Sequence, residues 1–364
     1  MPMTTDQQRP VGNATPLRYS ERNTAALKRF RMLPKVDLHR HLEGSLRLDT
    51  MLDIARKHDI SVPSDVLDLS NLVQMQDRDS FTFRTFLAKF DTLRLFYRSP
   101  EVIQRITHEA IEDASRDNVK YLELRVTPVA LSRAERFPLH DVTNWMLAAC
   151  REAAHEFGIV VNVVLSVNRH EDPQLAEQVA WLAVEHKDDG VVGLDLAGNE
   201  AEFPAEPFYG IFKEARQSGI HLTIHAGEWG PAANVRDAIE NFRAERIGHG
   251  VRVLEDDAVV DLARERGTAF EVCVTSNQQT GAVNAHASHP LTRMLERGLN
   301  VTLNTDDPSI SRITLSHEYH VVCDELGLSD AALKERVLAA ARAAFLPPAD
   351  RQALVAQMQK GLQL

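Results

Sequence analysis

The sequence predicts an α/β protein, a (β/α)8 TIM barrel with extra helices inserted after strand 1. Eight short apolar segments, rich in β-branched residues, alternate with segments of helical apolar spacing. Alternating strands and helices imply a parallel sheet, and eight is the number of strands that closes such a barrel. Polar residues that could carry chemistry follow six of the eight segments, as expected at the open end of a barrel.

The predicted strands are the apolar and β-branched runs. In order they are 35–39, 121–126, 159–167, 191–197, 221–226, 246–250, 269–274 and 300–304. Helical spacing of apolar residues is clear at 101–117, 143–157, 173–186, 256–266 and 331–346. A doubly wound open sheet is the alternative. It would place its site at one switch point, whereas polar residues here follow strands one and four to eight.

The first connection, residues 41–120, is too long for a simple βα unit and must contain several helices. Within it, segment 80–96 carries Phe86, Leu87 and Phe90 in an apolar stripe of helical spacing. Such a stripe usually packs in the core. The alternative is a hydrophobic lid over the barrel mouth that faces an aromatic substrate. Both hold if one edge of the segment packs and the other faces the pocket.

The composition favours one domain and a small-molecule ligand. No linker rich in Gly or Ser is present, so residues 24–364 should form a single domain. Residues 1–23 should be a disordered or loosely attached segment. This segment has no signal-peptide or anchor character. Lys plus Arg number 41 against 52 Asp plus Glu, a net charge of −11 that opposes binding to nucleic acid or membrane. No apolar run reaches the 18 residues of a membrane span.

Three widely spaced cysteines, Cys150, Cys273 and Cys323, favour free thiols in a reducing compartment. We therefore expect a cytoplasmic protein. The sequence leaves its oligomeric state open.

Strand ends supply the groups for a metal site. His39 and His41 are two residues apart on a predicted strand, so both imidazoles point to the same side. His225 follows the fifth strand, and the pair Asp306 and Asp307 follows the eighth. Three imidazoles and one carboxylate of that pair suit a catalytic zinc site with a position left for water. We expect one Zn²⁺ per subunit, although these ligand types also suit iron or cobalt.

Two further groups could act beside the metal. Glu228 lies three residues beyond His225 and could reach the same pocket as a proton carrier. Such a group typically contributes about 10²–10⁴ in rate. His249 follows the sixth strand and could hold or polarise the attacking water.

Taken together, these segments resemble the adenosine deaminases of the metal-dependent amidohydrolase superfamily. The resemblance runs from about Pro34 to the end of the chain. It rests on DLHRHLEG (37–44), FLAKFD (86–91), YLELRVTP (121–128), DLAGNE (195–200), HAGE (225–228), RIGHG (246–250), TSNQQTGAV (275–283), HPL (289–291) and NTDDP (304–308). The combination is highly specific, although no single motif is.

The resemblance implies a role for each matching residue. Zinc would lie on His39, His41, His225 and Asp306. Glu228 would protonate the purine ring at N1, and His249 would assist the attacking hydroxide. The substrate would contact His41, Glu43, Gly198, Asp307, Phe86, Leu87 and Phe90, with Asp307 at N7 and the Gly198 backbone at N3. Glycine is sensible there because only a residue without a side chain lets backbone approach a flat ring closely.

The implied reaction is the zinc-dependent hydrolytic deamination of adenosine or 2′-deoxyadenosine, with release of ammonia. One departure concerns the substrate. Adenosine deaminases usually read HLDG where this chain reads HLEG, with Glu43, and relatives that act on free adenine commonly have Glu there. The alternatives are therefore adenine or another aminopurine, and a 6-amino-6-deoxyfutalosine-type nucleoside with an altered 5′ end. No basic cluster near the motifs suggests a phosphate site, which disfavours a nucleotide, although a single arginine from elsewhere would reverse that.

Other classes of function are weaker interpretations. The same zinc barrel could hydrolyse an amide, lactone or phosphoester, because activated water is indifferent to the electrophile. A phosphoester needs no ring protonation, however, so Glu228 argues against that chemistry. A non-catalytic binding protein is disfavoured because every expected position is filled.

Overall fold

The computed structural model describes residues 24–364 and contains one sheet of eight parallel strands in chain order. The strands are β1 (Lys35–His41), β2 (Val119–Val126), β3 (Val160–Asn168), β4 (Val191–Ala197), β5 (His221–Ala226), β6 (Arg246–His249), β7 (Ala269–Val272) and β8 (Asn300–Leu303). All eight predicted strands are present, within two residues at each end. The predicted barrel is confirmed.

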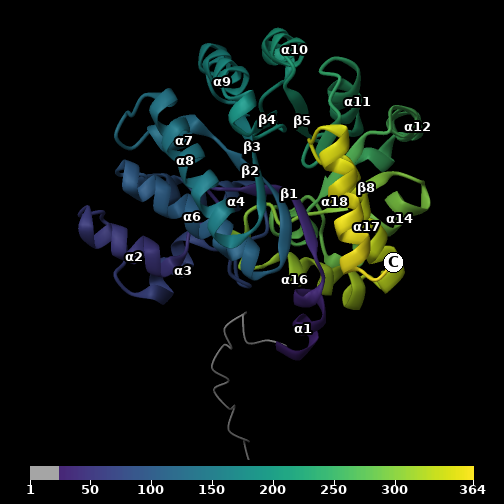
Figure 1. The fold of residues 1–364 in the computed structure, drawn as a ribbon, viewed down its shortest axis with the longest axis horizontal. Helices are drawn as coiled ribbons and strands as arrows, with labels where there is room; N and C mark the ends of the chain where they lie inside the picture. Colours follow the sequence, from purple (N-terminus) through teal and green to yellow (C-terminus); the bar gives the residue numbers. More distant parts are fainter. Residues whose placement is uncertain (1–23) are drawn as a thin grey trace, which may run out of the picture.

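Helices form an outer layer around the strands (Figure 1). The longer ones are α1 (Thr24–Met32), α2 (Leu48–Lys57), α3 (Val66–Val73), α6 (Pro100–Arg116), α8 (Leu139–Phe157), α9 (Pro173–Glu185), α10 (Tyr209–Gln217), α11 (Ala232–Glu240), α12 (Asp257–Arg266), α17 (Asp330–Ala343) and α18 (Pro348–Gly361). The short ones are α4 (Phe83–Leu87), α5 (Lys89–Leu93), α7 (Pro128–Ser132), α13 (Val274–Gln279), α14 (Leu291–Glu296), α15 (Pro308–Ser311) and α16 (Leu315–His320).

Short 3-10 turns and one π-helical segment complete the elements. They are η2 (Arg94–Phe96), η3 (Lys187–Asp189), η4 (Glu206–Phe208), η5 (Val253–Glu255), η6 (His286–Ser288) and the π-helical η7 (Val321–Glu325). Residues 1–23, predicted to be a loose N-terminal segment, lie outside the described residues, so the domain boundary stays a prediction.

The connection between β1 and β2 contains the predicted extra helices, α2 to α6. Segment 80–96, however, is not one regular helix but α4, α5 and η2 in succession. Ala88, between the first two, keeps α-helical dihedrals, and the amide of Asp91 bonds back only three residues to its carbonyl. These i→i+3 bonds tighten the helix locally, as in a 3-10 turn. The apolar stripe survives this break, and Phe86 is buried in the core.

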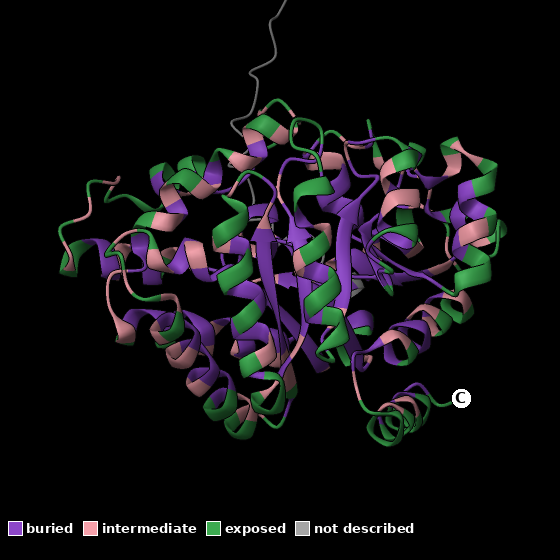
Figure 2. Ribbon diagram, turned by 90° about the horizontal axis from the view of Figure 1, so that it is seen from above, coloured by how far each residue is buried: buried purple, intermediate pink, exposed green. Residues whose placement is uncertain are grey.

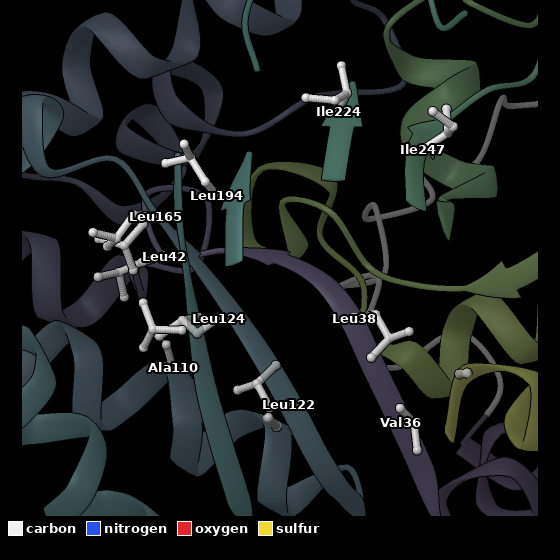
Figure 3. Close-up of a cluster of buried hydrophobic side chains, with 14 of the residues drawn as sticks. Val36, Leu38, Leu42, Ala110, Leu122, Leu124, Leu165, Leu194, Ile224 and Ile247 are labelled. Carbon is white, nitrogen blue, oxygen red and sulfur yellow. The ribbon is translucent and has the colours of Figure 1, made fainter. Parts of the chain in front are cut away.

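Strand side chains alternate between two environments. Outward-facing residues such as Leu122 and Leu124 of β2 lie with Ala110 of α6 in an apolar cluster between sheet and helices (Figure 3). Figure 2 shows the consequence, since the strands are mostly buried while the outer helix faces are exposed. The main apolar core is therefore the layer between strands and helices.

The inside of the barrel is charged rather than apolar. Arg125 of β2 pairs with Asp195 of β4 at 2.9 Å and with Glu271 of β7. Arg246 of β6 pairs with the same Glu271 at 2.6 Å and with Glu123 of β2. Because β2 and β7 are not neighbours in the sheet, these contacts span the interior. Each of these side chains is at most 1% exposed, and charges so buried are tolerated only when paired.

The ring of strands closes through an isolated bridge between Arg40 of β1 and Asp306, just after β8. The amide of His41 donates to the carbonyl of Asp306 at 2.8 Å, and the amide of Asp306 donates to the carbonyl of His39 at 2.7 Å. Helix α17 contacts both β8 and β1 and covers this junction. Closure of the barrel therefore brings together residues from the two ends of the sheet.

Two other expectations concern the chain as a whole. Within residues 24–364, no helix combines the length and apolar character needed to cross a membrane. All three cysteines are free thiols, and Cys150 and Cys273 are buried.

Candidate active site

Four predicted groups meet where the barrel closes. The Nε2 atoms of His39 and His41 lie 3.2 Å apart, and they lie 3.3 and 3.4 Å from Oδ1 of Asp306. The ring of His225, from the end of β5, lies 4.7 Å from the ring of His39 between centroids. Ligand-type atoms of His39, His225, His249 and Asp306 all lie within 4.8 Å of one another. The structure thus joins residues that are far apart in sequence.

Two residues of the site have a strained backbone conformation. Asp306 and His249 adopt φ values of 64° and 62°, in the left-handed region that non-glycine residues rarely occupy. Such conformations persist only where the surrounding structure imposes them, and they concentrate at functional sites. Gly248, just before His249, makes room for the rings, since a Cβ there would lie 3.1 Å from both His39 and His225.

Buried carboxylates orient the imidazoles. Asp195 lies 2.9 Å from Nδ1 of His225, and Glu271 lies 3.1 Å from Nδ1 of His39. Burial would raise the pKa of Asp195, but His225 and Arg125 hold that pKa well below its usual range. A carboxylate at Nδ1 leaves Nε2 to act as a ligand, the usual arrangement around a bound metal. The donor set of three imidazoles and a carboxylate therefore fits a zinc ion.

Helix α13 and the residue after it support the other side of the site. The hydroxyl of Ser276 donates to Oδ2 of Asp306 at 2.6 Å, and Asn277 lies 3.0 Å from Nδ1 of His249. The hydroxyl of Thr280 donates to Oε1 of Glu228 at 3.1 Å. In the sequence, this stretch was only one part of the family resemblance, and its contacts with the site were not predicted. Its position directly after β7 was the available signal.

Glu200 is a second residue whose role sequence analysis missed. Its Oε1 accepts the amides of Glu228, Trp229 and Gly230 at 2.6, 2.7 and 2.8 Å. Its Oε2 accepts the amide of Gly227 at 3.0 Å. One buried carboxylate therefore fixes the loop that carries Glu228.

A cavity of about 370 Å³ opens beside these groups. Ten predicted site residues line it, namely His41, Glu43, Phe86, Leu87, Phe90, Gly198, His225, Glu228, Asp306 and Asp307. His39 and His249 are not among its lining residues, and both are at most 1% exposed. His249 still contacts the lining, since its Nε2 lies 3.7 Å from Oε2 of Glu228.

Further lining residues were not predicted. Phe83 stacks on Trp229 at 5.2 Å between ring centroids, and Arg84 pairs with Glu202 at 2.5 Å. The remaining ones include Arg94, Thr127, Asn168 and His170. The sequence showed no basic cluster near the motifs but left open an arginine from elsewhere, and two arginines line the wall. Both come from segment 80–96, outside the metal-binding motifs.

Two buried carboxyls in the wall favour the protonated form. Burial raises the pKa of Glu228 well above its usual range, and the charges of Asp306 and Glu200 add to the rise. Burial likewise raises the pKa of Asp307, again with help from Asp306. The cavity can therefore offer acidic protons next to a metal-ligand cluster.

A parallel barrel whose carboxyl-end cavity joins three imidazoles, a carboxylate and a protonatable glutamate defines a metal-dependent hydrolase. Comparison with known proteins specifies it further. The sequence profile of the adenosine deaminase family matches residues 34–361, and the chain belongs to this family. An adenosine deaminase from Klebsiella pneumoniae (strain 342) is 35% identical over 330 residues, which are 90% of this chain and 98% of the relative.

Solved structures agree with this membership. A zinc-bound amidohydrolase from Burkholderia ambifaria superposes with a TM-score of 0.85 at 27% identity, covering 93% of each chain. An N6-mAMP deaminase from Arabidopsis superposes with a TM-score of 0.81 at 28% identity, covering 92% of this chain and 99% of that one. The protein is thus a hydrolase of the adenosine deaminase family, and its fold is shared along nearly the whole chain.

Proposed function

We propose that this protein is a zinc-dependent deaminase that converts adenosine or 2′-deoxyadenosine to inosine or 2′-deoxyinosine and releases ammonia. One observation carries the proposal, namely a buried glutamate in the wall of a cavity that also contains a zinc-type ligand cluster. Oε2 of Glu228 lies 3.7 Å from Nε2 of His249, which lies 3.9 Å from Oδ2 of Asp306. Acid, base and metal ligands are therefore within reach of one bound ring.

We assign the metal to His39, His41, His225 and Asp306, as the sequence predicted. Zinc supplies Lewis acidity, which lowers the pKa of a bound water from 15.7 to about 7. Asp195 and Glu271 support this assignment, because they fix the orientation of two of the imidazoles.

Glu228 is suited to deliver a proton to N1 of the purine. Burial raises its pKa well above the usual range, which favours the protonated form, and the Thr280 hydroxyl donates to its Oε1. Protonation of N1 removes electron density from C6 and makes the ring open to attack. His249 is suited to take a proton from the attacking water, since burial lowers its pKa well below the usual value and keeps it neutral.

The remaining predicted residues suit a purine in the cavity. Asp307, with its raised pKa, can donate to N7, an acceptor. Gly198 has φ of 88°, and a Cβ there would lie 3.2 Å from the Arg169 amide, so its bare backbone can face the ring edge. Phe86, Leu87 and Phe90 supply an apolar wall. Phe86 also packs in the core, as predicted, while the role of the segment as a lid stays a prediction.

Glu43 favours a nucleoside over a free base. Its Oε1 accepts the Thr127 amide at 2.6 Å, while its Oε2 lies in the cavity wall without a partner. A sugar hydroxyl would satisfy that second oxygen, whereas adenine has none to offer. Adenine, an aminofutalosine-type nucleoside and, from the name of the Arabidopsis relative, a nucleotide remain the alternative substrates. Hydrolysis of an amide, lactone or phosphoester would leave Glu228 without its role.

The test is a substrate panel with zinc-loaded protein. Adenosine, 2′-deoxyadenosine, adenine and 5′-modified adenosines are compared by kcat/KM, from the loss of adenine absorbance and from ammonia release. The two nucleosides should exceed adenine by at least about tenfold. A preference for adenine would overturn the substrate, and stoichiometric zinc without deamination of any adenine compound would overturn the reaction.

A further inference from the structure

The cavity wall contains four buried polar atoms that lack a hydrogen-bond partner among the described residues. Two are acceptors, Oε2 of Glu43 and Oδ1 of Asp307, and two are donors, Nε of Arg94 and Nε1 of Trp229. Buried polar groups are nearly always paired in folded proteins. All four belong to residues that line the cavity, so the wall holds unpaired acceptors and unpaired donors close to a bound ligand.

Arg94 is the member of this pattern that carries a full positive charge. Within residues 24–364, the Nε of Arg94 has no hydrogen-bond partner, and its guanidinium forms no ion pair with a carboxylate. The other arginine in the wall, Arg84, already pairs with Glu202 at 2.5 Å. Arg94 instead lies over the ring of Phe90, 6.0 Å from its centroid. Its side chain is supported by an aromatic ring while its charge stays unpaired.

The position of Arg94 is on the sugar side of the proposed substrate. Arg94 and Glu43 both line this cavity. Glu43 in turn is bonded to Thr127, just after β2. The proton donor Glu228 comes from the loop after β5, a different sector of the mouth. A purine held near Glu228 and Asp307 would therefore direct its sugar toward Glu43 and Arg94.

Unmodified adenosine would leave the charge of Arg94 without an anionic partner. Its sugar hydroxyls satisfy Glu43, but they offer Arg94 only neutral oxygens. A guanidinium presents a planar fork of N–H donors that matches the two oxygens of a carboxylate or phosphate. A partly buried, unpaired guanidinium is costly for the free protein, and an oxyanion removes that cost.

We propose that Arg94 is a specificity-determining residue that binds an oxyanion, a carboxylate or a phosphate, attached to the sugar of the substrate. This inference rests on the proposed deaminase function. Adenosine remains a substrate, and an adenine nucleoside with an acidic substituent at its 5′ end is the preferred one. A hydrogen bond to a charged group typically changes affinity by about tenfold to a hundredfold. That range is the preference expected for the acidic substrate over adenosine.

The experiment compares adenosine, adenosine-5′-carboxylate and AMP as substrates of the zinc-loaded protein. The ratio of kcat/KM for each anion to that for adenosine is measured in the wild type, Arg94→Gln and Arg94→Lys. At least one anion should be preferred by about tenfold or more, the Gln variant should lose that preference through KM, and the Lys variant should recover part of it. The carboxylate and phosphate arms identify which anion the site accepts.

A matched control is Arg98→Gln. Arg98 lies four residues further on, pairs with Glu135 at 3.1 Å and does not line the cavity, so its removal should leave the ratio unchanged within twofold. Calorimetry with the products inosine, inosine-5′-carboxylate and IMP gives the same comparison as dissociation constants, without turnover. Thermal melting confirms that each variant is folded.

The outcomes separate this inference from the function on which it rests. Turnover of adenosine without an anion preference, or a ratio that Arg94→Gln leaves unchanged, overturns the role of Arg94 and leaves the deaminase intact. Failure to deaminate any of the three compounds at full zinc occupancy overturns the proposed function itself.

Discussion

At the scale of single residues, Glu228 is the group that we propose for the step that distinguishes ring deamination from other hydrolyses. Its carboxyl is buried next to Asp306 and Glu200, and both charges favour the protonated form. A glutamine keeps the shape of the side chain but cannot transfer a proton.

We therefore expect Glu228→Gln to retain stoichiometric zinc while kcat falls by about 10²–10⁴. Metal analysis of the preparation measures the zinc content, and steady-state kinetics on the same preparation measures kcat. Glu240→Gln, at the exposed end of α11, is the matched control and should behave as wild type. Near-normal turnover in the Glu228 variant would remove its role as the acid.

The two adjacent aspartates have different predicted roles. Oδ1 of Asp306 lies 3.3 Å from His39 and 3.4 Å from His41, and Ser276 holds its other oxygen. Asp307 instead lines the cavity with an unpartnered Oδ1. Only the first is positioned as a metal ligand.

Asp306→Ala should lose far more zinc affinity than Asp307→Ala. Outer-shell changes typically cost about 10–100-fold in metal affinity, so removal of a ligand should cost more than that. Competition with a chelator of known affinity measures the difference. If both variants bind zinc equally, Asp306 is not a ligand.

At the scale of elements, the loop after β5 depends on one carboxylate from the loop after β4. Glu200 accepts four consecutive amides, those of residues 227–230, and the side-chain amide of Asn234. No local pattern in residues 227–230 requires this arrangement.

In Glu200→Gln, an NH₂ group replaces one acceptor and opposes at least one of these donors. Lost hydrogen bonds to a charged group cost about 1.5–3 kcal/mol each. We expect kcat to fall by about tenfold or more with zinc retained, and amide exchange to accelerate at residues 227–230. Kinetics and hydrogen exchange measure these effects. Glu206→Gln, on the exposed turn η4, is the control, and equal exchange in both variants would contradict the positioning role.

Helix α13 begins against a buried acid of α16. Both oxygens of Glu318 lie 3.2–3.3 Å from the amide of Thr275, and burial raises the pKa of Glu318 to about 7. The unfolded chain ionises this group near pH 4.5, so the folded state binds its proton more tightly. Stability from this group is therefore full below about pH 4.5 and falls as the pH rises to 7.

Glu318→Gln should remove that slope. Between pH 5 and 8, the free energy of unfolding of the wild type should fall relative to the variant by up to about 3 kcal/mol. Urea denaturation at intervals of one pH unit measures the difference. Glu335→Gln, on the exposed face of α17, should show no such trend. A constant difference across the range would show that Glu318 is ionised throughout.

At the scale of the whole molecule, the charged side chains inside the barrel contribute both to the stability of the fold and to the geometry of the proposed metal site. Arg125 pairs with Asp195 and Glu271, and these carboxylates orient His225 and His39. The same network that fills the barrel therefore positions two of the proposed metal ligands.

Arg125→Met should destabilise the fold by about 3–5 kcal/mol, because it leaves two buried carboxylates with one partner fewer. It should also weaken zinc binding, since both carboxylates orient ligands. Urea denaturation of the metal-free protein separates the two effects. Arg297→Met breaks an exposed pair with Asp257 and should cost no more than about 1 kcal/mol. A similar small cost for Arg125→Met would mean that the network contributes little.

The sequence alone determined the strands and the barrel of this protein, and it predicted the four residues that we propose as metal ligands. Apolar runs and helical spacing are local signals, and residues at strand ends are placed at one mouth once the strands are parallel. Positions after strands also indicated a proton carrier in Glu228 and a water-binding group in His249. The resemblance to a known family then specified their contacts and gave Asp307 its expected role.

Only the tertiary structure decided how those residues are held and what else surrounds them. Arg125 and Glu271 are 146 positions apart, and Glu200 lies 28 positions from Glu228, so no local pattern could pair them. The left-handed backbone of Asp306 and the unpaired charge of Arg94 likewise follow from barrel closure and from which elements border the cavity. Periodicity reports the surroundings of one segment, whereas hydrogen bonds and charge pairing depend on distances that exist only after the chain has folded.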